Sequence, residues 1–267
     1  MKKFNQIASR IRYETIKLVH ESKTAHLGSC LSCIDILVAT YFSKLLFKSK
    51  VNNKQNLKDT FILSKGHAAP ALYVVLQMQG YISKKLLKTY AKPNSYLEEH
   101  PNIKINGVLV SSGSLGHGLS YAAGIALADK INKQKNTHIV LMSDGECNEG
   151  STWEAAMFII GKKINNVLAF IDCNRWQATD RTNNIVKLEP MKEKWKSFGW
   201  KTYEIDGHNY ESLISVIKKF KKSPKPTAII CRTTKGKGIS FMEDDNLWHY
   251  RSPSKEEFLR SIKELDL

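Results

Sequence analysis

Apolar residues follow two kinds of pattern along this chain, and each pattern predicts one kind of element. Ile7, Ile11, Thr15 and Leu18 fall on one stripe, which predicts an amphipathic helix over residues 5–22. Short apolar runs predict buried strands at 60–63, 138–142, 167–171, 201–205 and 227–231. Further helices are expected at 33–47, 68–79, 151–163, 210–222 and 254–264.

The segment from 138 to 171 is the clearest unit. Its two apolar strands flank a helix that begins near Ser151, and Ser151 and Glu154 are spaced as a capping box. Strands joined through a helix of this length pair in parallel, and the pattern recurs further along the chain. We therefore predict an α/β fold, a doubly wound parallel sheet with helices on both faces, formed by residues 1–267 as a single domain. Ligands bind such sheets at the carboxyl ends of the strands.

Composition narrows the class of protein. The 267 residues are 42% hydrophobic and 25% charged, as in ordinary soluble proteins. No apolar run approaches the roughly 20 residues of a membrane helix, and the first residues lack the apolar core of a signal peptide. We expect a cytoplasmic protein that does not contact membranes.

The charge first suggests a nucleic-acid partner. The net charge is +16, from 41 basic and 25 acidic residues. The lysines are spread along the chain, with only mild clusters at 48–58 and 218–225, and no nucleic-acid motif accompanies them. We therefore predict no nucleic-acid binding, and the charge is compatible with anionic phosphate substrates.

The five cysteines are an odd number with wide spacing, which does not predict a disulfide framework. Cys30 and Cys33 form a CxxC pair without a second pair or other ligands nearby. We expect them to be small, packed residues of a helix.

Two polar residues follow neighbouring strands of the predicted sheet. Asp144 comes after the strand at 138–142, and Asn174 comes after the strand at 167–171. A carboxylate and an amide oxygen suit Mg²⁺ or Ca²⁺ rather than zinc, and magnesium often shares its shell with phosphate oxygens. Asp-Gly also occurs in ordinary turns, so these residues alone leave both interpretations open.

Ser143-Asp144-Gly145-Glu146, with Asn174 thirty residues after Asp144, resembles the GDG…N motif of thiamine-diphosphate enzymes. Further segments resemble transketolase motifs in the same order: 24–29, 64–68, 99–101, 114–118, 235–241 and 248–249. The resemblance implies that Asp144, Asn174 and the backbone carbonyl of Trp176 bind the metal. The chain departs from the family at Ser143 and Glu99, where glycine is usual, at His117, where glutamine is usual, and over 175–180.

The same resemblance assigns roles to histidines. His26, His67, His100 and His249 match histidines that surround the thiazolium ring and the sugar, with His67 and His249 nearest the diphosphate and the reacting carbonyl, and with His26 and His100 on substrate hydroxyls. For a histidine taken singly, a surface position or a hydrogen-bonded structural role is the more common case, and we expect a structural role for His20, His138 and His208. The remaining residues that the resemblance places at the cofactor are Gly116, Gly145, Glu149 and Asn174.

The resemblance implies the N-terminal subunit of a transketolase, which moves a two-carbon ketol unit from a ketose to an aldose with thiamine diphosphate and Mg²⁺ or Ca²⁺. A separate C-terminal subunit would supply the glutamate that activates the cofactor, which Glu149 would contact, in an assembly with two of each chain acting on sugars or sugar phosphates. The alternatives are one chain of a 2-oxo acid dehydrogenase E1 component, a deoxyxylulose-phosphate synthase-like protein, or a non-catalytic relative.

Overall fold

The computed structural model describes residues 1–47 and 59–265, so the lysine cluster at 48–58 lies outside the described residues. Within these ranges the chain forms a five-stranded parallel sheet with the strand order β1-β2-β3-β5-β4. The strands are β1 (Thr60–Leu63), β2 (His138–Ser143), β3 (Val167–Cys173), β4 (Lys201–Asp206) and β5 (Thr227–Arg232). All five predicted strands are thus confirmed, each to within two residues at its end.

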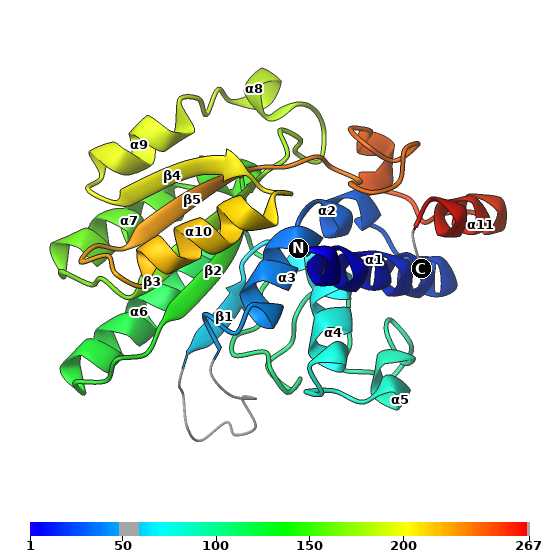
Figure 1. Ribbon diagram of the computed structural model, residues 1–267, viewed down its shortest axis with the longest axis horizontal. Helices are drawn as coiled ribbons and strands as arrows, with labels where there is room; N and C mark the ends of the chain where they lie inside the picture. Colours follow the sequence, from blue (N-terminus) through cyan, green and yellow to red (C-terminus); the bar gives the residue numbers. More distant parts are fainter. Residues whose placement is uncertain (48–58, 266–267) are drawn as a thin grey trace.

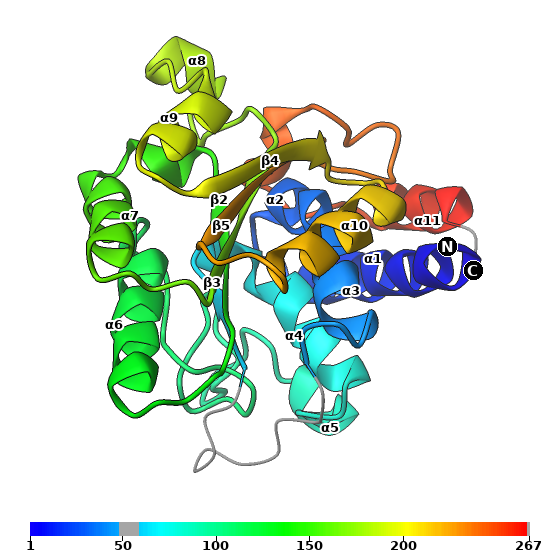
Figure 2. The ribbon, with the colours of Figure 1, turned by 60° about the vertical axis from the view of Figure 1, so that its left-hand side comes forward.

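Helices cover both faces of the sheet, as the predicted fold class requires (Figures 1 and 2). On one side lie α1 (Lys2–Ser22), α2 (Leu27–Ser32), α3 (Ile34–Phe42), α4 (Ala69–Met78) and α10 (Tyr210–Phe220). On the other side lie α6 (His117–Ile131), α7 (Gly150–Gly161) and α9 (Met191–Ser197). The remaining α-helices described are the short α5 (Lys84–Leu87) and α8 (Thr182–Ile185), and α11 (Lys255–Glu264).

The central strands are apolar throughout because side chains alternate between two separate cores. In β2, Ile139 and Leu141 pack into the core beneath α1, α3 and α4, whereas Val140 and Met142 pack into the core beneath α6 and α7. Successive side chains of a strand point to opposite faces. A strand buried on both faces therefore shows a continuous apolar run, the pattern that predicted these strands.

Two local predictions were wrong. The capping box of Ser151 and Glu154 does not form, because Glu149 is the N-cap of α7 and the Ser151 hydroxyl donates to the carbonyl of Gly116 at 3.1 Å. A capping box does form at α11, between Ser254 and Glu257. The single helix expected at 33–47 is shorter than predicted, and α2 lies directly before it.

Helix α6 was not predicted. It is rich in alanine and glycine, and large apolar residues such as Tyr121 and Ile131 lie on its exposed side, so no clear apolar stripe marks it. Its small buried side chains, among them Ala122 and Ala126, pack against β2 and α7. Close approach to the sheet, rather than a strong amphipathic pattern, therefore positions this helix.

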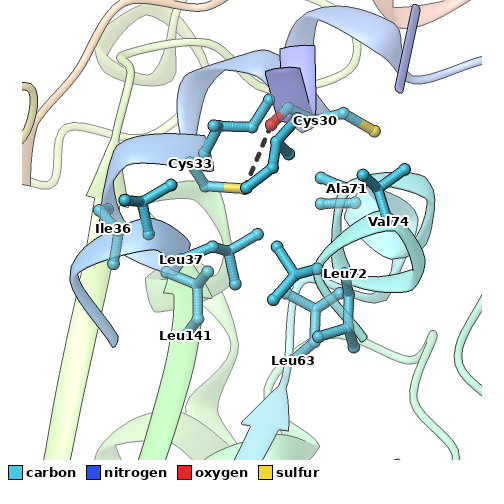
Figure 3. Close-up of a cluster of buried hydrophobic side chains, with 14 of the residues drawn as sticks. Cys30, Cys33, Ile36, Leu37, Leu63, Ala71, Leu72, Val74 and Leu141 are labelled. Carbon is cyan, nitrogen blue, oxygen red and sulfur yellow. Dashed lines mark hydrogen bonds between the residues drawn. The ribbon is translucent and has the colours of Figure 1, made fainter. Parts of the chain in front are cut away.

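The cysteine pair packs into the core beside α4 (Figure 3). Cys30 and Cys33 are free thiols with no exposed surface, and the Cys33 Sγ points to the carbonyl of Cys30 at 3.4 Å. Around them lie Leu37, Leu72 and other apolar side chains. The prediction of small packed residues is confirmed.

Within 1–47 and 59–265, no helix combines the length and the apolar character needed to cross a membrane.

Candidate functional site

The carboxyl ends of β2 and β3 bring the two predicted strand-end residues together. The strands pair in register from His138 opposite Val167 to Ser143 opposite Asp172. Asp144 and Asn174 therefore leave the sheet at the same edge, and the backbone N–H of Arg175 donates to Asp144 Oδ2 at 2.8 Å. This contact joins the loop after β3 to the loop after β2.

Asp144 is almost wholly buried. Its Oδ2 also accepts from the Thr182 hydroxyl at 3.0 Å, and its Oδ1 accepts from the backbone N–H of Gly145 at 2.9 Å. Burial, followed by the nearby charge of Asp172, raises the pKa of Asp144 to about 6. A carboxylate in this position is one that a cation would stabilise.

Asn174 is also buried, and it is held from two sides. Its Nδ2 donates to the Ser32 hydroxyl at 3.3 Å, and its Oδ1 accepts from the backbone N–H of Trp176 at 3.0 Å. No group of three or more His, Cys, Asp and Glu side chains that could hold a metal occurs in the part of the chain that the structure describes. The predicted set is of another kind, with one carboxylate, one amide and one backbone carbonyl.

A buried ion pair lies behind Asn174, and the sequence did not predict it. Lys65 and Asp172 have no exposed side-chain surface and form a salt bridge. Asp172 also accepts from the hydroxyls of Ser32 at 2.6 Å and Thr233. Burial would lower the pKa of Lys65. The charge of Asp172, its hydrogen bond to the lysine and the nearby cysteines together outweigh burial and raise that pKa, so the lysine stays charged. The pair fixes Ser32, and Ser32 in turn fixes Asn174.

Glu146 is a second buried residue whose position sequence reasoning missed, although it stands within the Asp-Gly motif. Its carboxylate accepts from the Ser64 hydroxyl, from the backbone N–H of Gly116 at 2.9 Å and from that of Ser143 at 3.3 Å. Burial raises its pKa. Glu146 therefore ties together the segment after β1, the start of α6 and the end of β2.

Gly116 must be a glycine. Its φ is +82°, and an added Cβ would lie 2.6 Å from the Cβ of Glu149. Glu149 is itself exposed at the N-cap of α7. The close approach of these residues places the N-terminus of α6 beside the loop after β2.

The absence of a side chain at Gly145 leaves room for the side chain of Gln177. A Cβ at Gly145 would lie 2.8 Å from the Cγ of Gln177. The Nε2 of Gln177 is buried, and it finds no hydrogen-bond partner among residues 1–47 and 59–265. Buried donors in proteins usually have a hydrogen-bond partner. The Gln177 amide, beside the residue that follows Asp144, could therefore donate to an acceptor atom of a bound ligand.

Four histidines, His26, His67, His100 and His249, form a cluster that we call the histidine cluster. The ring centroid of His26 lies 4.9 Å from that of His249, 5.6 Å from that of His67 and 6.2 Å from that of His100. The rings of His67 and His249 lie 5.7 Å apart. Residues from opposite ends of the chain thus meet in one place.

Helix α2 joins the histidine cluster to the strand ends. The Ser29 hydroxyl lies 3.3 Å from His249 Nδ1, and Ser32, one turn later, contacts Asn174. His26 precedes α2 with a φ of +68°, and its backbone N–H donates to the carbonyl of His249 at 3.0 Å. A left-handed backbone is uncommon for residues other than glycine, although histidine adopts it more readily than most.

His67 and His249 have lowered pKa values and are therefore neutral near pH 7. Burial first, and then the charge of Lys65, lower the pKa of His67 well below its usual value. Burial and the charge of Lys235 lower the pKa of His249 to about 3. Near pH 7 both rings therefore carry one N–H donor and one nitrogen lone pair.

Lys235 opens the segment 235–241 that resembles a family motif, and the structure places it in the site. Its Nζ donates to the Oδ1 of Asn246 at 2.6 Å and lies 3.2 Å from His249 Nδ1. Burial and the charge of Lys65 lower its pKa to about 7. Lys235 beside the histidine cluster can therefore be either protonated or neutral near pH 7.

The loops after β3 and before α11 are clamped together by Asp244. Its carboxylate receives two bonds of 2.6 Å from Arg181 and one of 2.8 Å from the indole N–H of Trp176. The Arg181 guanidinium also lies 3.7 Å from the centre of the Trp176 ring. Asn246 donates to the carbonyl of Ala178 at 2.8 Å. We call these contacts the Asp244 clamp.

The other histidines are engaged elsewhere. His138 lies between Thr60 and Asp129, and His20 contacts the Pro253 carbonyl and stacks on Phe258. His208 lies between Asp35 and the backbone N–H of Thr234. His117 is exposed and begins α6.

The sequence of this chain is similar to those of known proteins. Residues 4–265 match the family described as "Transketolase, thiamine diphosphate binding domain". The chain is 38% identical to one of the subunits of apulose-4-phosphate transketolase of Phocaeicola vulgatus, over 95% of this chain and 90% of that protein. It is 37% identical to 6-deoxy-6-sulfo-D-fructose transketolase subunit SqwG of a Clostridium species, over 97% and 94%.

A solved structure shows the same fold. Transketolase from Campylobacter jejuni is similar with a TM-score of 0.90 at 26% identity. The match covers 99% of this chain and 43% of that one. The chain therefore spans less than half the length of this transketolase.

Proposed function

Since this chain belongs to the transketolase family, matching its thiamine diphosphate binding domain over residues 4–265, we propose that it is the N-terminal subunit of a two-subunit transketolase. Such an enzyme transfers a two-carbon ketol unit from a ketose to an aldose. The histidine cluster carries the proposal, because α2 joins it directly to the strand ends of Asp144 and Asn174.

Thiamine diphosphate with Mg²⁺ or Ca²⁺ is the proposed cofactor, and the residues present suit it. Asp144, Asn174 and the Trp176 carbonyl offer hard oxygen ligands. The buried amide nitrogen of Gln177 beside Gly145 offers a donor to a phosphate oxygen. When bound, the cofactor supplies a nucleophilic carbon that accepts the two-carbon unit.

The histidine cluster would hold and move protons at the oxygens of the sugar. Neutral His67 and His249 each present a donor to a carbonyl or alkoxide oxygen and an acceptor to a hydroxyl. Lys235, with a pKa lowered to about 7, is charged next to His249 below that pH and becomes neutral above it. That charge favours oxygen atoms that become negative during transfer.

We propose that a separate C-terminal subunit completes the site. Two relatives named as subunits are covered to 90% and 94% by this chain, which supports a partner on another chain. The partner would carry the pyrimidine-binding domain and the activating glutamate, which exposed Glu149 would contact. Residues 1–267 would act as one domain, in a cytoplasmic assembly with two of each chain.

The substrates we propose are sugars or sugar phosphates. The two relatives are named for sugars that carry a phosphate or a sulfo group, and a chain with a net charge of +16 attracts such anions. Since these relatives are transketolase subunits, they favour transketolase over the dehydrogenase and synthase alternatives.

The test is reconstitution. The purified chain, a C-terminal transketolase subunit from the same organism, and their mixture would be assayed with thiamine diphosphate and Mg²⁺. Hydroxypyruvate would serve as the donor and glycolaldehyde as the acceptor, with erythrulose measured as the product. We expect turnover from the mixture only. Equal turnover by this chain alone would contradict the need for a partner, and no turnover by a stable mixed complex would contradict the activity.

A further inference from the structure

Glu99 stands at the edge of the histidine cluster. Its Oε2 lies 4.0 Å from His26 Nδ1, and its side chain is 45% exposed. No lysine or arginine in the described ranges lies within ion-pair distance of it. A carboxylate without such a counter-charge, beside a site proposed for anionic sugars, needs an explanation because it repels phosphate.

The backbone of Glu99 is fixed in place. The hydroxyl of Tyr73, which has no exposed surface, contacts the carbonyl of Glu98 at 3.0 Å and the carbonyl of His100 at 2.9 Å. These two carbonyls flank Glu99. The ring of His100 packs on Gly113, where an added Cβ would lie 3.2 Å from the ring. The carboxylate is therefore presented from a fixed segment rather than from a loose loop.

The distance between the two side chains suits a shared ligand. A separation of 4.0 Å is too long for a direct hydrogen bond, which needs about 3 Å. One hydroxyl that bonds to both partners, with bonds of about 2.8 Å and a near-tetrahedral angle, places those partners roughly 4.5 Å apart. The carboxylate accepts the hydroxyl proton, and the imidazole bonds to the hydroxyl oxygen.

Building on the proposed function, we propose that Glu99 and His26 form a subsite for one neutral hydroxyl of the sugar and exclude an anionic group there. His26 lies next to His249 and His67, so the hydroxyl belongs to a carbon close to the reacting carbonyl. A phosphate or sulfo group of the same sugar must then bind elsewhere. Glu99 is thus a specificity-determining residue.

The electrostatic surroundings of His26 agree with this arrangement. Burial lowers the pKa of His26, the charge of Glu99 raises it, and His100, Lys235 and Lys65 lower it. The rings of His67 and His249 also face it. Among these groups only Glu99 carries a negative charge, so removing that charge should lower the pKa of His26.

The first measurement compares two acceptors in the reconstituted complex. Glycolaldehyde and glyoxylate differ at the carbon next to the aldehyde, which carries a hydroxyl in one and is a carboxylate in the other. We expect Glu99→Gln to lower the ratio of their kcat/KM values by at least about tenfold, the change typical of losing a charged hydrogen-bond acceptor. Glu98→Gln, at the neighbouring exposed carboxylate, should leave the ratio within about twofold. An unchanged ratio in Glu99→Gln overturns the proposal.

The second measurement does not require turnover. Histidine ring resonances of the full chain would be titrated by NMR, with His26 assigned from a His26→Asn variant. Glu99→Gln should lower the pKa of His26, whereas Glu98→Gln should leave it in place. If Glu99→Gln leaves the pKa unchanged, the carboxylate does not face His26 and the subsite is rejected. If the wild-type complex fails to turn over, the proposed function fails while this result still decides the role of Glu99.

Discussion

At the scale of single residues, burial and neighbouring charge decide what each polar group can do. Asp144 and His249 are both shifted toward their neutral forms by burial, with Asp172 and Lys235 as the next causes of the pKa shifts. These shifts favour a cation beside the carboxylate and keep the imidazole neutral, with one donor and one acceptor nitrogen. The first two predictions test these groups one at a time.

Asp144→Ala is expected to weaken cofactor binding, because it removes the only carboxylate among the proposed metal ligands. Calorimetry of thiamine diphosphate and Mg²⁺ binding to the mixed complex would measure the change. A loss of at least about tenfold corresponds to about 1.4 kcal/mol. Asp206→Ala is the matched control, since Asp206 ends the edge strand β4. Unchanged affinity in Asp144→Ala would remove the metal assignment.

His67→Ala and His249→Ala are each expected to lower kcat/KM by at least about tenfold. General acid–base contributions are typically about 10²- to 10⁴-fold, and tenfold is about 1.4 kcal/mol of transition-state stabilisation. His138→Ala is the control, because His138 bonds to Thr60 and Asp129 away from the cluster. It should alter stability without altering kinetics. Wild-type kinetics in both cluster variants would show that these histidines are structural.

At the scale of elements, the loops that follow the parallel strands are held by one another. The Asp244 clamp fixes the loop after β3 through Trp176 and Arg181, and the same segment continues to His249. Movement of the proposed metal-binding loop is therefore coupled to the position of a cluster histidine. This coupling runs through side chains that are partly exposed, so its contribution to global stability is small.

Asp244→Ala is expected to loosen residues 175–182 without unfolding the protein. Hydrogen exchange measured by mass spectrometry should show several-fold faster exchange in this segment, and the free energy of unfolding should fall by only about 1 kcal/mol. Glu204→Ala offers a matched control, because Glu204 pairs with Arg232 at similar exposure on the edge strand β4. If exchange in 175–182 does not respond to Asp244→Ala, the clamp does not hold the loop.

At the scale of the whole molecule, a buried carboxylate joins segments distant in sequence. Asp35 in α3 accepts from Arg12 of α1 at 2.6 Å and from the Tyr210 hydroxyl of α10 at 2.6 Å, and it lies 2.7 Å from His208 Nδ1. Burial alone would raise the pKa of Asp35. The charge of Arg12 and the bonds from His208 and Arg12 outweigh burial and lower that pKa. Three helices on one face of the sheet, α1, α3 and α10, are therefore joined through the Asp35 carboxylate.

Asp35→Asn is expected to lower the free energy of unfolding by about 3–5 kcal/mol at pH 7, because it leaves Arg12 buried without its counter-charge. A folded-state pKa below the unfolded value of about 3.9 gives stability that is present above that value and lost as the pH falls through the folded pKa. The difference between wild type and variant should therefore shrink below about pH 4. Urea titrations from pH 3 to 7 would measure it, with Glu211→Gln on the exposed side of α10 as control. A difference independent of pH would show that ionisation of Asp35 is not involved.

The amino-acid sequence was sufficient to predict the strands, their parallel pairing and the two strand-end residues. A strand buried on both faces must be apolar throughout, and parallel strands end at one edge, so Asp144 and Asn174 could be placed together from local pattern and topology. The four cluster histidines were found through motifs. Their proximity in the structure was expected from resemblance rather than from spacing.

The partners of the buried polar groups could be identified only from the folded chain. Lys65 and Asp172 are separated by 107 positions, and Ser64 and Glu146 by 82, so no local pattern records their contacts. The apparent capping box failed for the same reason, because the Ser151 hydroxyl found the distant carbonyl of Gly116. Local pattern fixes which surfaces are buried, since burial follows from apolar periodicity. Which polar groups meet depends on how the loops close over the sheet, and the pairing of Glu99 with His26 at 4.0 Å belongs to that second kind.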